Sequence, residues 1–238
     1  MKTVMYRAST RGHMYHGWLD THHTFSFASY YNPERMHFGA LRVVNDDIVE
    51  GGEGFGKHPH DNMEIVSIPL YGDLEHKDSM GHTSVIHAGE IQVMSAGSGL
   101  YHSEYNSNPD KPLNFFQIWV FPNKQNVEPR YDQKKFDFLE KKNSLVQVVS
   151  PDAEDGSLWL HQDTWFHLGT FDKDAEAEYK LKKKGDGVFA MVIEGEFEIG
   201  NEKLHHRDGI GIWDIDSVQI KSLSENGRIL LIEVPMEF

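Results

Sequence analysis

Two short motifs in the first half of the chain combine imidazole and carboxylate groups at a spacing of two residues. The first pairs His58 with His60 across a proline, and the second pairs His102 with Glu104 across a serine. Side chains two residues apart on a β-strand point to the same face, so each motif directs both polar groups to one side. On two facing strands of a barrel, the four groups would converge on a single cation.

The donor set of three imidazole nitrogens and one carboxylate predicts a divalent transition metal. Imidazole suits Fe, Mn, Co, Ni, Cu and Zn, whereas Ca and Mg prefer sites built from oxygen. The chain has no cysteine, which excludes thiolate ligands, disulfide bonds and a cysteine nucleophile. The alternative is that the two motifs are unrelated polar turns, but their matching spacing favours the metal site.

Glu64 and the other histidines need a separate interpretation. Glu64 lies an even number of residues from His58 and His60, so on a regular strand it would face the same cavity. There it could serve as a ligand, as a base or as a group that orients a ligand. We expect ordinary roles for seven further histidines, as surface groups, groups at the barrel rim or core groups with satisfied hydrogen bonds. These are His13, His16, His22, His23, His76, His82 and His87. Adjacent His205 and His206 would point to opposite faces of a strand and share no site.

The elements that must position these groups are strands. Short runs rich in β-branched, aromatic and aliphatic residues recur between turn signals, which predicts an all-β fold. The runs are Leu41–Val49, Met63–Leu70, Val85–Met94, Phe115–Phe121, Leu145–Val149, Phe189–Ile199, Ile210–Ile220 and Ile229–Val234. A charged segment at 124–143 shows no strand alternation and is expected to contain one short helix. We therefore predict an N-terminal domain over 1–123, this connecting segment, and a C-terminal domain over 144–238.

A faint internal repeat indicates that both domains are copies of one barrel. YGDLEH followed by AGEIQVMSAG in the first half resembles EGEFEI followed by DGIGIWDID in the second. When Gly72 is aligned with Gly195 and Gly89 with Gly209, the ligand positions fall on residues that make no metal-binding set. These residues are Leu181, Lys183, Ser222 and Ser224. We therefore expect the C-terminal barrel to carry no metal ligands.

The composition of the chain restricts its partners. Lys and Arg total 23 against 37 Asp and Glu, a formal net charge of −14. This charge repels phosphate backbones and anionic lipid headgroups, so we expect no direct nucleic-acid binding and no membrane association. No apolar run has the length of a signal peptide or of a membrane span, which favours a cytoplasmic protein.

The segments LRVVNDD, GFGKHPHDNMEI, LEHKDSMG and MSAGSGLYHSEYN closely resemble the pirin family of cupins, particularly its bacterial members with quercetin 2,3-dioxygenase activity. The resemblance covers the first domain densely and continues more thinly into the second. It implies a bicupin, in which two double-stranded β-helix (jelly-roll) barrels pack together. It also implies one divalent metal in the N-terminal barrel, held by His58, His60, His102 and Glu104. Fe(II) is favoured, with Mn, Co, Ni, Cu and Zn as the alternatives.

The same resemblance implies an oxidoreductase that cleaves a flavonol such as quercetin with O2 and releases carbon monoxide. Either Glu104 or Glu64 would accept the proton of the flavonol 3-hydroxyl. A planar substrate also needs an apolar slot. The residues available to form one are Phe25, Phe27, Phe55, Met63, Phe115, Phe116 and Trp119. We expect the protein to be a monomer.

Two other functions fit the same residues. Eukaryotic pirins are nuclear cofactors, so the resemblance also allows a non-catalytic, metal- and redox-dependent regulator that binds a transcription factor or an enzyme. A metal-dependent cupin acting on another enolic substrate, for instance as an isomerase, is the second alternative, because a fold does not fix a reaction. Oxygen uptake and carbon monoxide release with quercetin would distinguish the dioxygenase from both.

Overall fold

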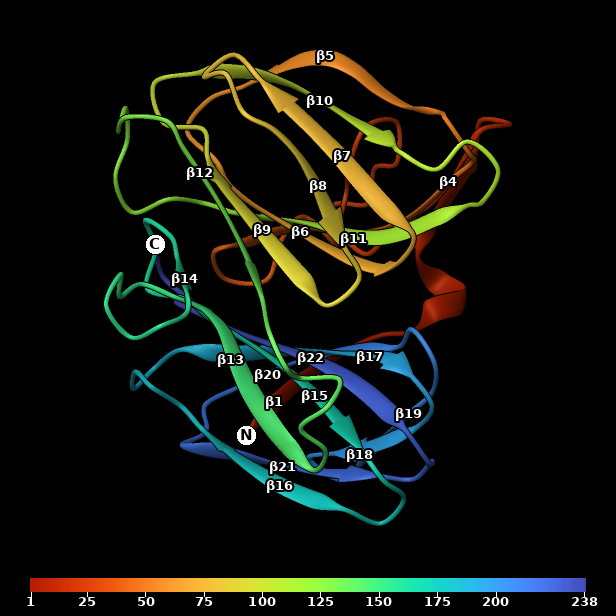
Figure 1. Cartoon of the computed structure of the whole chain (residues 1–238). Coiled ribbons are helices and arrows are strands. Elements are labelled where there is room, and N and C mark those ends of the chain that lie inside the picture. Colours follow the sequence, from red (N-terminus) through yellow and green to blue (C-terminus); the bar gives the residue numbers. More distant parts are fainter. The chain divides into compact units, whose positions relative to one another are not determined.

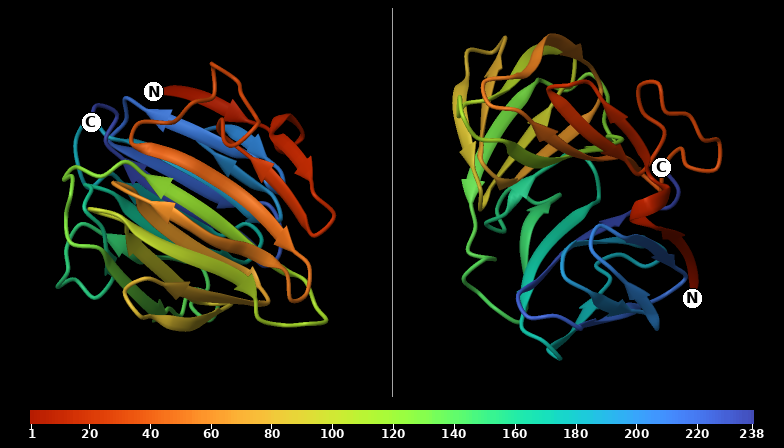
Figure 2. Two further views of the ribbon diagram at one scale, coloured as in Figure 1. Left: turned by 90° about the horizontal axis from the view of Figure 1, so that it is seen from above. Right: turned by 90° about the vertical axis from the view of Figure 1, so that its right-hand side faces the viewer.

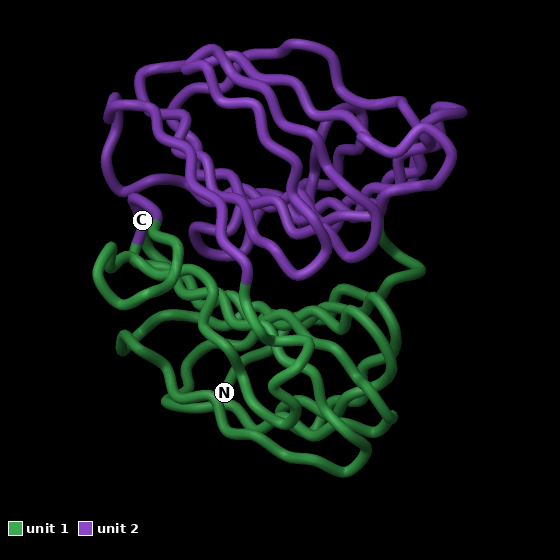
Figure 3. The backbone as a smooth tube through the Cα atoms, viewed as in Figure 1, with its two compact units in different colours: residues 1–11, 136–159, 163–238 green, residues 12–135, 160–162 purple.

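A computed structural model describes residues 1–238, and its regular structure consists of strands apart from one 3-10 turn, η1 (Ala8–Thr10). The prediction of an all-β fold is confirmed. The chain forms two compact units (Figure 3). Unit 2 contains residues 12–135 and 160–162, and unit 1 contains residues 1–11, 136–159 and 163–238. No helix has the length and apolar character that crossing a bilayer requires.

Unit 2 contains one seven-stranded and one four-stranded antiparallel sheet (Figure 1). The larger sheet has the order β12-β9-β6-β11-β4-β3-β2, and the smaller has the order β5-β10-β7-β8. The strands are β2 (Gly12–Tyr15), β3 (Leu19–His23), β4 (Leu41–Val49), β5 (Gly54–His60), β6 (Glu64–Tyr71), β7 (Asp73–Asp78), β8 (Thr83–His87), β9 (Glu90–Ser95), β10 (Leu100–Asn106), β11 (Leu113–Val120) and β12 (Arg130–Lys135). In the right-hand view of Figure 2 these strands surround a common interior.

Unit 1 repeats this plan with its own strands. Its seven-stranded sheet has the order β1-β20-β17-β22-β15-β13-β14, and its four-stranded sheet the order β16-β21-β18-β19. The strands are β1 (Lys2–Tyr6), β13 (Ser144–Ser150), β14 (Leu158–Trp159), β15 (Trp165–Phe171), β16 (Glu176–Lys180), β17 (Gly187–Glu194), β18 (Phe197–Ile199), β19 (Glu202–Leu204), β20 (Gly209–Trp213), β21 (Ser217–Ser222) and β22 (Gly227–Val234). Gly72 and Gly195, which the repeat aligns with each other, lie in turns with positive φ of 81° and 80°. Apart from the edge strands of the large sheets, the two units have the same strand order, which agrees with two copies of one barrel.

One edge strand of each large sheet comes from outside the part of the chain that was predicted to form that domain. β1, at the start of the chain, pairs with β20 in unit 1, and β12, within the charged segment, pairs with β9 in unit 2. The predicted short helix between 124 and 143 is therefore wrong. Because an edge strand buries only part of its surface, the charged sequence of β12 hides the alternation that identifies a strand.

Five of the predicted apolar runs correspond to single strands, and the other three are each divided by a tight turn. Val85–Met94 is divided at Gly89, Phe189–Ile199 at Gly195, and Ile210–Ile220 at Asp214, and all three turn residues have positive φ. The turn residues Gly89, Gly195 and Asp214 lie inside these runs, so each run joins two short strands rather than forming one.

The alternation of buried and exposed residues along β10 shows how unit 2 aims polar groups inward. Leu100, His102, Glu104 and Asn106 are each at most 3% exposed, whereas Tyr101 is 51% exposed. The buried face of β10 is therefore the interior face of the barrel. Its two central positions are the histidine and the glutamate of the second sequence motif.

Candidate metal centre

The two sequence motifs lie on neighbouring strands of the four-stranded sheet of unit 2. β5 pairs antiparallel with β10, so that His58 is opposite His102 and His60 is opposite Leu100. Between His58 and Phe55, three steps along β5 face two steps along β10, which is a β-bulge. The register and the bulge bring the predicted histidines to one face.

The rings of the three predicted histidines form a compact triangle. Ring centroids are 4.4 Å apart for His58 and His102, 4.8 Å for His60 and His102, and 4.9 Å for His58 and His60. One ligand atom from each ring lies within 4.8 Å of the others. His102 is buried, whereas His58 and His60 are partly exposed, so the cluster is accessible from the side of β5.

Local hydrogen bonding leaves a free lone pair on His58. Its Nδ1 lies 2.8 Å from the carbonyl oxygen of Gly56, inside the bulge. A carbonyl can only accept, so Nδ1 must carry the proton and donate it. The Nε2 atom of a neutral His58 then has its lone pair available to a metal.

Loss of contact with water keeps the imidazoles of His60 and His102 neutral. Desolvation, together with repulsion from neighbouring histidines, lowers the pKa of His60 to about 3 and the pKa of His102 to about 3. The Nε2 atom of His102 is buried and has no hydrogen-bond partner. A buried nitrogen without a partner is costly, and a metal ion that accepts its lone pair would remove that cost. The residues present therefore fit a metal.

Glu104 belongs to the same interior face and is held by two neutral donors. Gln117 donates to Oε2 over 2.7 Å and Ser67 donates to Oε1 over 3.2 Å. One ligand atom each of Glu104, His76 and His102 lies within 4.8 Å of the others. These three residues form a second group, which shares His102 with the histidine triangle. Burial raises the pKa of Glu104. A nearby cation would favour the carboxylate form again.

His76 is a residue of the site that the sequence interpretation placed at the barrel rim, and that expectation is wrong. Its side chain is fully buried, because β7 pairs with β10 and sets His76 opposite Glu104. The alternation of Leu74, His76 and Asp78 could have revealed this, since Leu74 also faces the core. His82 and His87 lie further out, with side chains that are 42% and 60% exposed.

A chain of contacts from Asp78 sets the tautomer of His102. His76 Nε2 lies 3.2 Å from Asp78 Oδ2, and its Nδ1 lies 3.4 Å from Nδ1 of His102. Asp78 is buried, yet hydrogen bonds from His82 and His76 keep its pKa below the usual value. The ionised carboxylate can only accept, so His76 donates from Nε2 and accepts at Nδ1 in its neutral form. His102 then carries its proton on Nδ1 and presents its Nε2 lone pair.

Asp78→Asn tests this chain. The amide nitrogen would donate where Oδ2 accepts, which reverses the tautomer of His76 and opposes the metal-binding tautomer of His102. We expect metal affinity to fall by about 10- to 100-fold, as is usual when a group that orients a ligand is lost. A competition titration with a chelating dye measures this. His87→Ala, which breaks a 2.6 Å contact with Asp73 in the same hairpin, should leave the affinity unchanged; an equal loss in both variants would disprove the assigned role.

The structure does not bring Glu64 to this cluster, so the parity argument for it was wrong. β5 ends at His60 and β6 begins at Glu64, with Asn62 at a positive φ of 43° between them. Ser67 contacts Glu104, and Glu64 lies three residues earlier on β6, so it faces the other side of the sheet. There it accepts a 2.7 Å hydrogen bond from Ser95, its cross-strand neighbour.

Glu64→Gln should therefore increase stability without affecting the metal. Burial raises the pKa of Glu64 from its ordinary value of 4.5 to about 7. Between these two pKa values the unfolded chain has lost the Glu64 proton and the folded chain still holds it. Glu64 therefore lowers the free energy of unfolding progressively as the pH rises to about 7, and by a constant amount above that pH. At pH 8 the variant should gain on the order of 2–3 kcal/mol.

Chemical denaturation at pH 5 and pH 8 measures this difference. The gain should be small at pH 5 and large at pH 8, with bound metal unchanged at both. Loss of metal from Glu64→Gln would instead restore Glu64 as a member of the site.

Apolar side chains line the site beside His60. The indole of Trp119 meets the His60 ring edge to face at 4.9 Å, and Phe27 meets Trp119 at 5.2 Å. Trp119 and Met63 pack against a cluster that contains Ile65. Of the other predicted slot residues, Phe115 and Phe55 belong to a separate core cluster, and Phe25 and Phe116 are fully buried.

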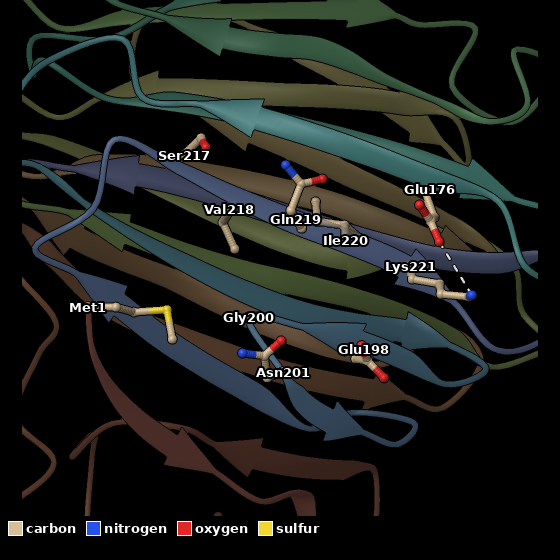
Figure 4. Close-up of a pocket in the computed structure, with 10 residues that line it drawn as sticks. All are labelled: Met1, Glu176, Glu198, Gly200, Asn201, Ser217, Val218, Gln219, Ile220 and Lys221. Atoms are coloured by element: carbon tan, nitrogen blue, oxygen red, sulfur yellow. Dashed lines mark ion pairs between the residues drawn. The ribbon is translucent and has the colours of Figure 1, made fainter.

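A surface cavity of about 320 Å³ lies in unit 1 and contains none of these residues (Figure 4). Its walls come from β16, β18 and β21 and include the ion pair of Glu176 with Lys221, at 3.3 Å. Two of these strands, β16 and β21, also carry the buried residues Tyr179, Val218 and Ile220, which belong to the core of unit 1. β16 and β21, which hold the places of β5 and β10 in the sheet order, thus carry aliphatic and tyrosine side chains at their buried positions.

Comparisons with known proteins agree on a single family. The family model described as Pirin matches residues 4–120, and the model described as Quercetinase C-terminal cupin domain matches residues 147–234. The quercetin 2,3-dioxygenase of Escherichia coli K12 is 44% identical over 229 residues, which cover 96% of this chain and 97% of that protein.

Solved structures give the same result. The crystal structure of YhhW from Escherichia coli has a TM-score of 0.94 and 42% identity and covers 100% of both chains. The crystal structure of bacterial pirin YhhW from Escherichia coli in complex with nickel(II) has a TM-score of 0.92 and 42% identity, and covers 98% of this chain and 99% of that one.

Proposed function

Because the chain belongs to the pirin family of cupins, we propose that it is a metal-dependent dioxygenase that cleaves a flavonol such as quercetin with O2 and releases carbon monoxide. The named relative supports an oxidoreductase of the quercetin 2,3-dioxygenase type. The observation that carries the proposal is the buried, partnerless Nε2 of His102 within a triangle of imidazoles.

In this proposal His58, His60, His102 and Glu104 hold one divalent transition metal. Three neutral nitrogens and a carboxylate are donors that such ions accept, and the similar Escherichia coli protein binds nickel(II). We propose Fe(II) as the resident ion, with nickel and the other ions named above as alternatives that elemental analysis distinguishes. When bound, the ion acidifies a coordinated hydroxyl group and stabilises the resulting anion.

Glu104 is the proposed proton acceptor for the substrate. The 3-hydroxyl of a flavonol that enters from the side of His58 and His60 would come within reach of the Glu104 carboxylate. Gln117 and Ser67 hold that carboxylate in place, and the two hydrogen bonds they donate favour its charged form. Glu64, on the other face of the sheet, has no role in this step.

Trp119 and its neighbours form the proposed wall for a planar aromatic substrate. The indole N–H of Trp119 is buried and has no partner. A carbonyl oxygen of a bound flavonol could accept from it, while the rings of Trp119 and Phe27 pack against the substrate and exclude water.

The test is an assay of the metal-loaded protein with quercetin under O2. We expect oxygen uptake and carbon monoxide release in equal amounts, both absent from metal-free protein. Oxygen uptake without carbon monoxide would mean simple oxidation of the flavonol. A protein that holds its metal and does neither would favour another enolic substrate or a regulatory role.

A further inference from the structure

A second group of metal-binding side chains lies on the β2–β3 hairpin of unit 2, away from the interior centre. His13 on β2 is directly opposite His22 on β3. Asp20 precedes His22 by two residues and shares its face, whereas Thr21 and His23 alternate to the buried face. Three potential ligands therefore share the accessible face of this hairpin.

The side chains already cluster at distances close to those of a metal site. His13 Nε2 lies 2.8 Å from Oδ1 of Asp20, and His22 Nδ1 lies 3.7 Å from the same oxygen. The imidazoles are stacked, with centroids 4.3 Å apart and planes at 11°. Ligand atoms around a tetrahedral zinc ion are roughly 3.3 Å apart, so small side-chain rotations would suffice.

The surrounding charge also favours a cation. On β4, Asp46 is the cross-strand neighbour of His22, so a second carboxylate lies on the same face. Asp46 is 6% exposed and accepts a 2.8 Å hydrogen bond from Asn114. Asp20 and Asp46 therefore place two carboxylates beside the imidazoles, a combination that attracts a cation.

We propose that His13, Asp20 and His22 form a second, exposed site for a divalent cation of the Zn²⁺, Cu²⁺ or Ni²⁺ class, independent of the interior centre. Two imidazoles and one carboxylate suit these ions and leave coordination positions for water or an external ligand. Since the ligands come from both strands of an edge hairpin, the ion would also cross-link β2 to β3. His13 is exposed and His22 partly exposed, as expected from the sequence, and the proposal gives both a specific role at that surface.

Calorimetric titration of the tag-free full-length chain with Zn²⁺, and separately with Cu²⁺, tests this proposal. The wild-type chain should bind a second equivalent of metal beyond the interior one. His102→Ala should lose only the interior equivalent, His22→Ala only the exposed one, and the double variant both. The separate His102→Ala arm distinguishes failure of this site from failure of the proposed dioxygenase centre.

Spectroscopy and a conservative variant make the test specific. Electron paramagnetic resonance of Cu²⁺ bound to His102→Ala should show coupling to imidazole nitrogens, with one nitrogen fewer at the exposed site when His22 is also replaced. Asp20→Asn keeps the size and an acceptor oxygen but removes the charge, and should weaken binding at least about tenfold; it decides the question if His22→Ala folds poorly. His16→Ala, at the exposed turn of the same hairpin, is the matched control. Unchanged exposed-site stoichiometry and affinity in both His22→Ala and Asp20→Asn would overturn the proposal.

Discussion

Replacing His102 by alanine should remove the interior metal and, with it, activity on a flavonol. His102 is the buried member of the histidine triangle, and its Nε2 has no other partner. Loss of a group that only orients a ligand costs about 10- to 100-fold in affinity, so loss of the ligand itself should cost more than about 100-fold. Oxygen uptake and carbon monoxide release should fall to the level of metal-free protein.

Elemental analysis after dialysis, followed by the quercetin assay, checks this expectation. His205→Ala is the control, because that histidine forms a hydrogen bond with Glu196 on the surface of unit 1. His58→Ala provides a second test, since His58 is partly exposed and its replacement leaves a smaller internal void. If His102→Ala and His58→Ala both retain stoichiometric interior metal, the assigned ligands are wrong.

The second large effect is expected from Glu104→Gln. The variant keeps the length of the side chain and one acceptor oxygen, but it loses the negative charge and the capacity to take a proton. We expect weaker metal binding, and a loss of about 10²- to 10⁴-fold in kcat when the site is saturated with metal, which is the usual contribution of a general base.

Activity per bound metal separates the two roles of Glu104. The assay is therefore run at saturating metal, with the occupancy measured on the same sample. Glu64→Gln serves as the matched control, because it is the same chemical change at a buried glutamate on the other face of the sheet. A Glu104→Gln variant with full occupancy and wild-type kcat would show that another group accepts the proton.

The three imidazoles could be predicted because strand alternation is a local property. His58 and His60 share one strand, as do His102 and Glu104, and a spacing of two fixes their common face wherever the strand lies. The all-β class was equally legible, since it follows from patterns of neighbouring residues. The internal repeat was only faint, because it rests on a comparison of segments far apart in the chain.

The prediction that Glu64 faces the metal site was wrong because the strand β5 ends before that residue. Glu64 kept the right spacing from His60, but the positive φ of Asn62 separates the two strands and resets which face is inward. The turn residues Asp61 and Asn62 mark this break in the sequence, but an argument from even spacing alone passes over them.

The sequence by itself determined which side chains could bind a metal and which of them share a strand. The tertiary structure alone decided which strands are neighbours and in what register. That pairing placed His76 against Glu104 in the interior and His13 against His22 on the hairpin. The physical reason is that cross-strand hydrogen bonds and shared burial join residues distant in the chain, and neither is expressed in the spacing of residues along one strand.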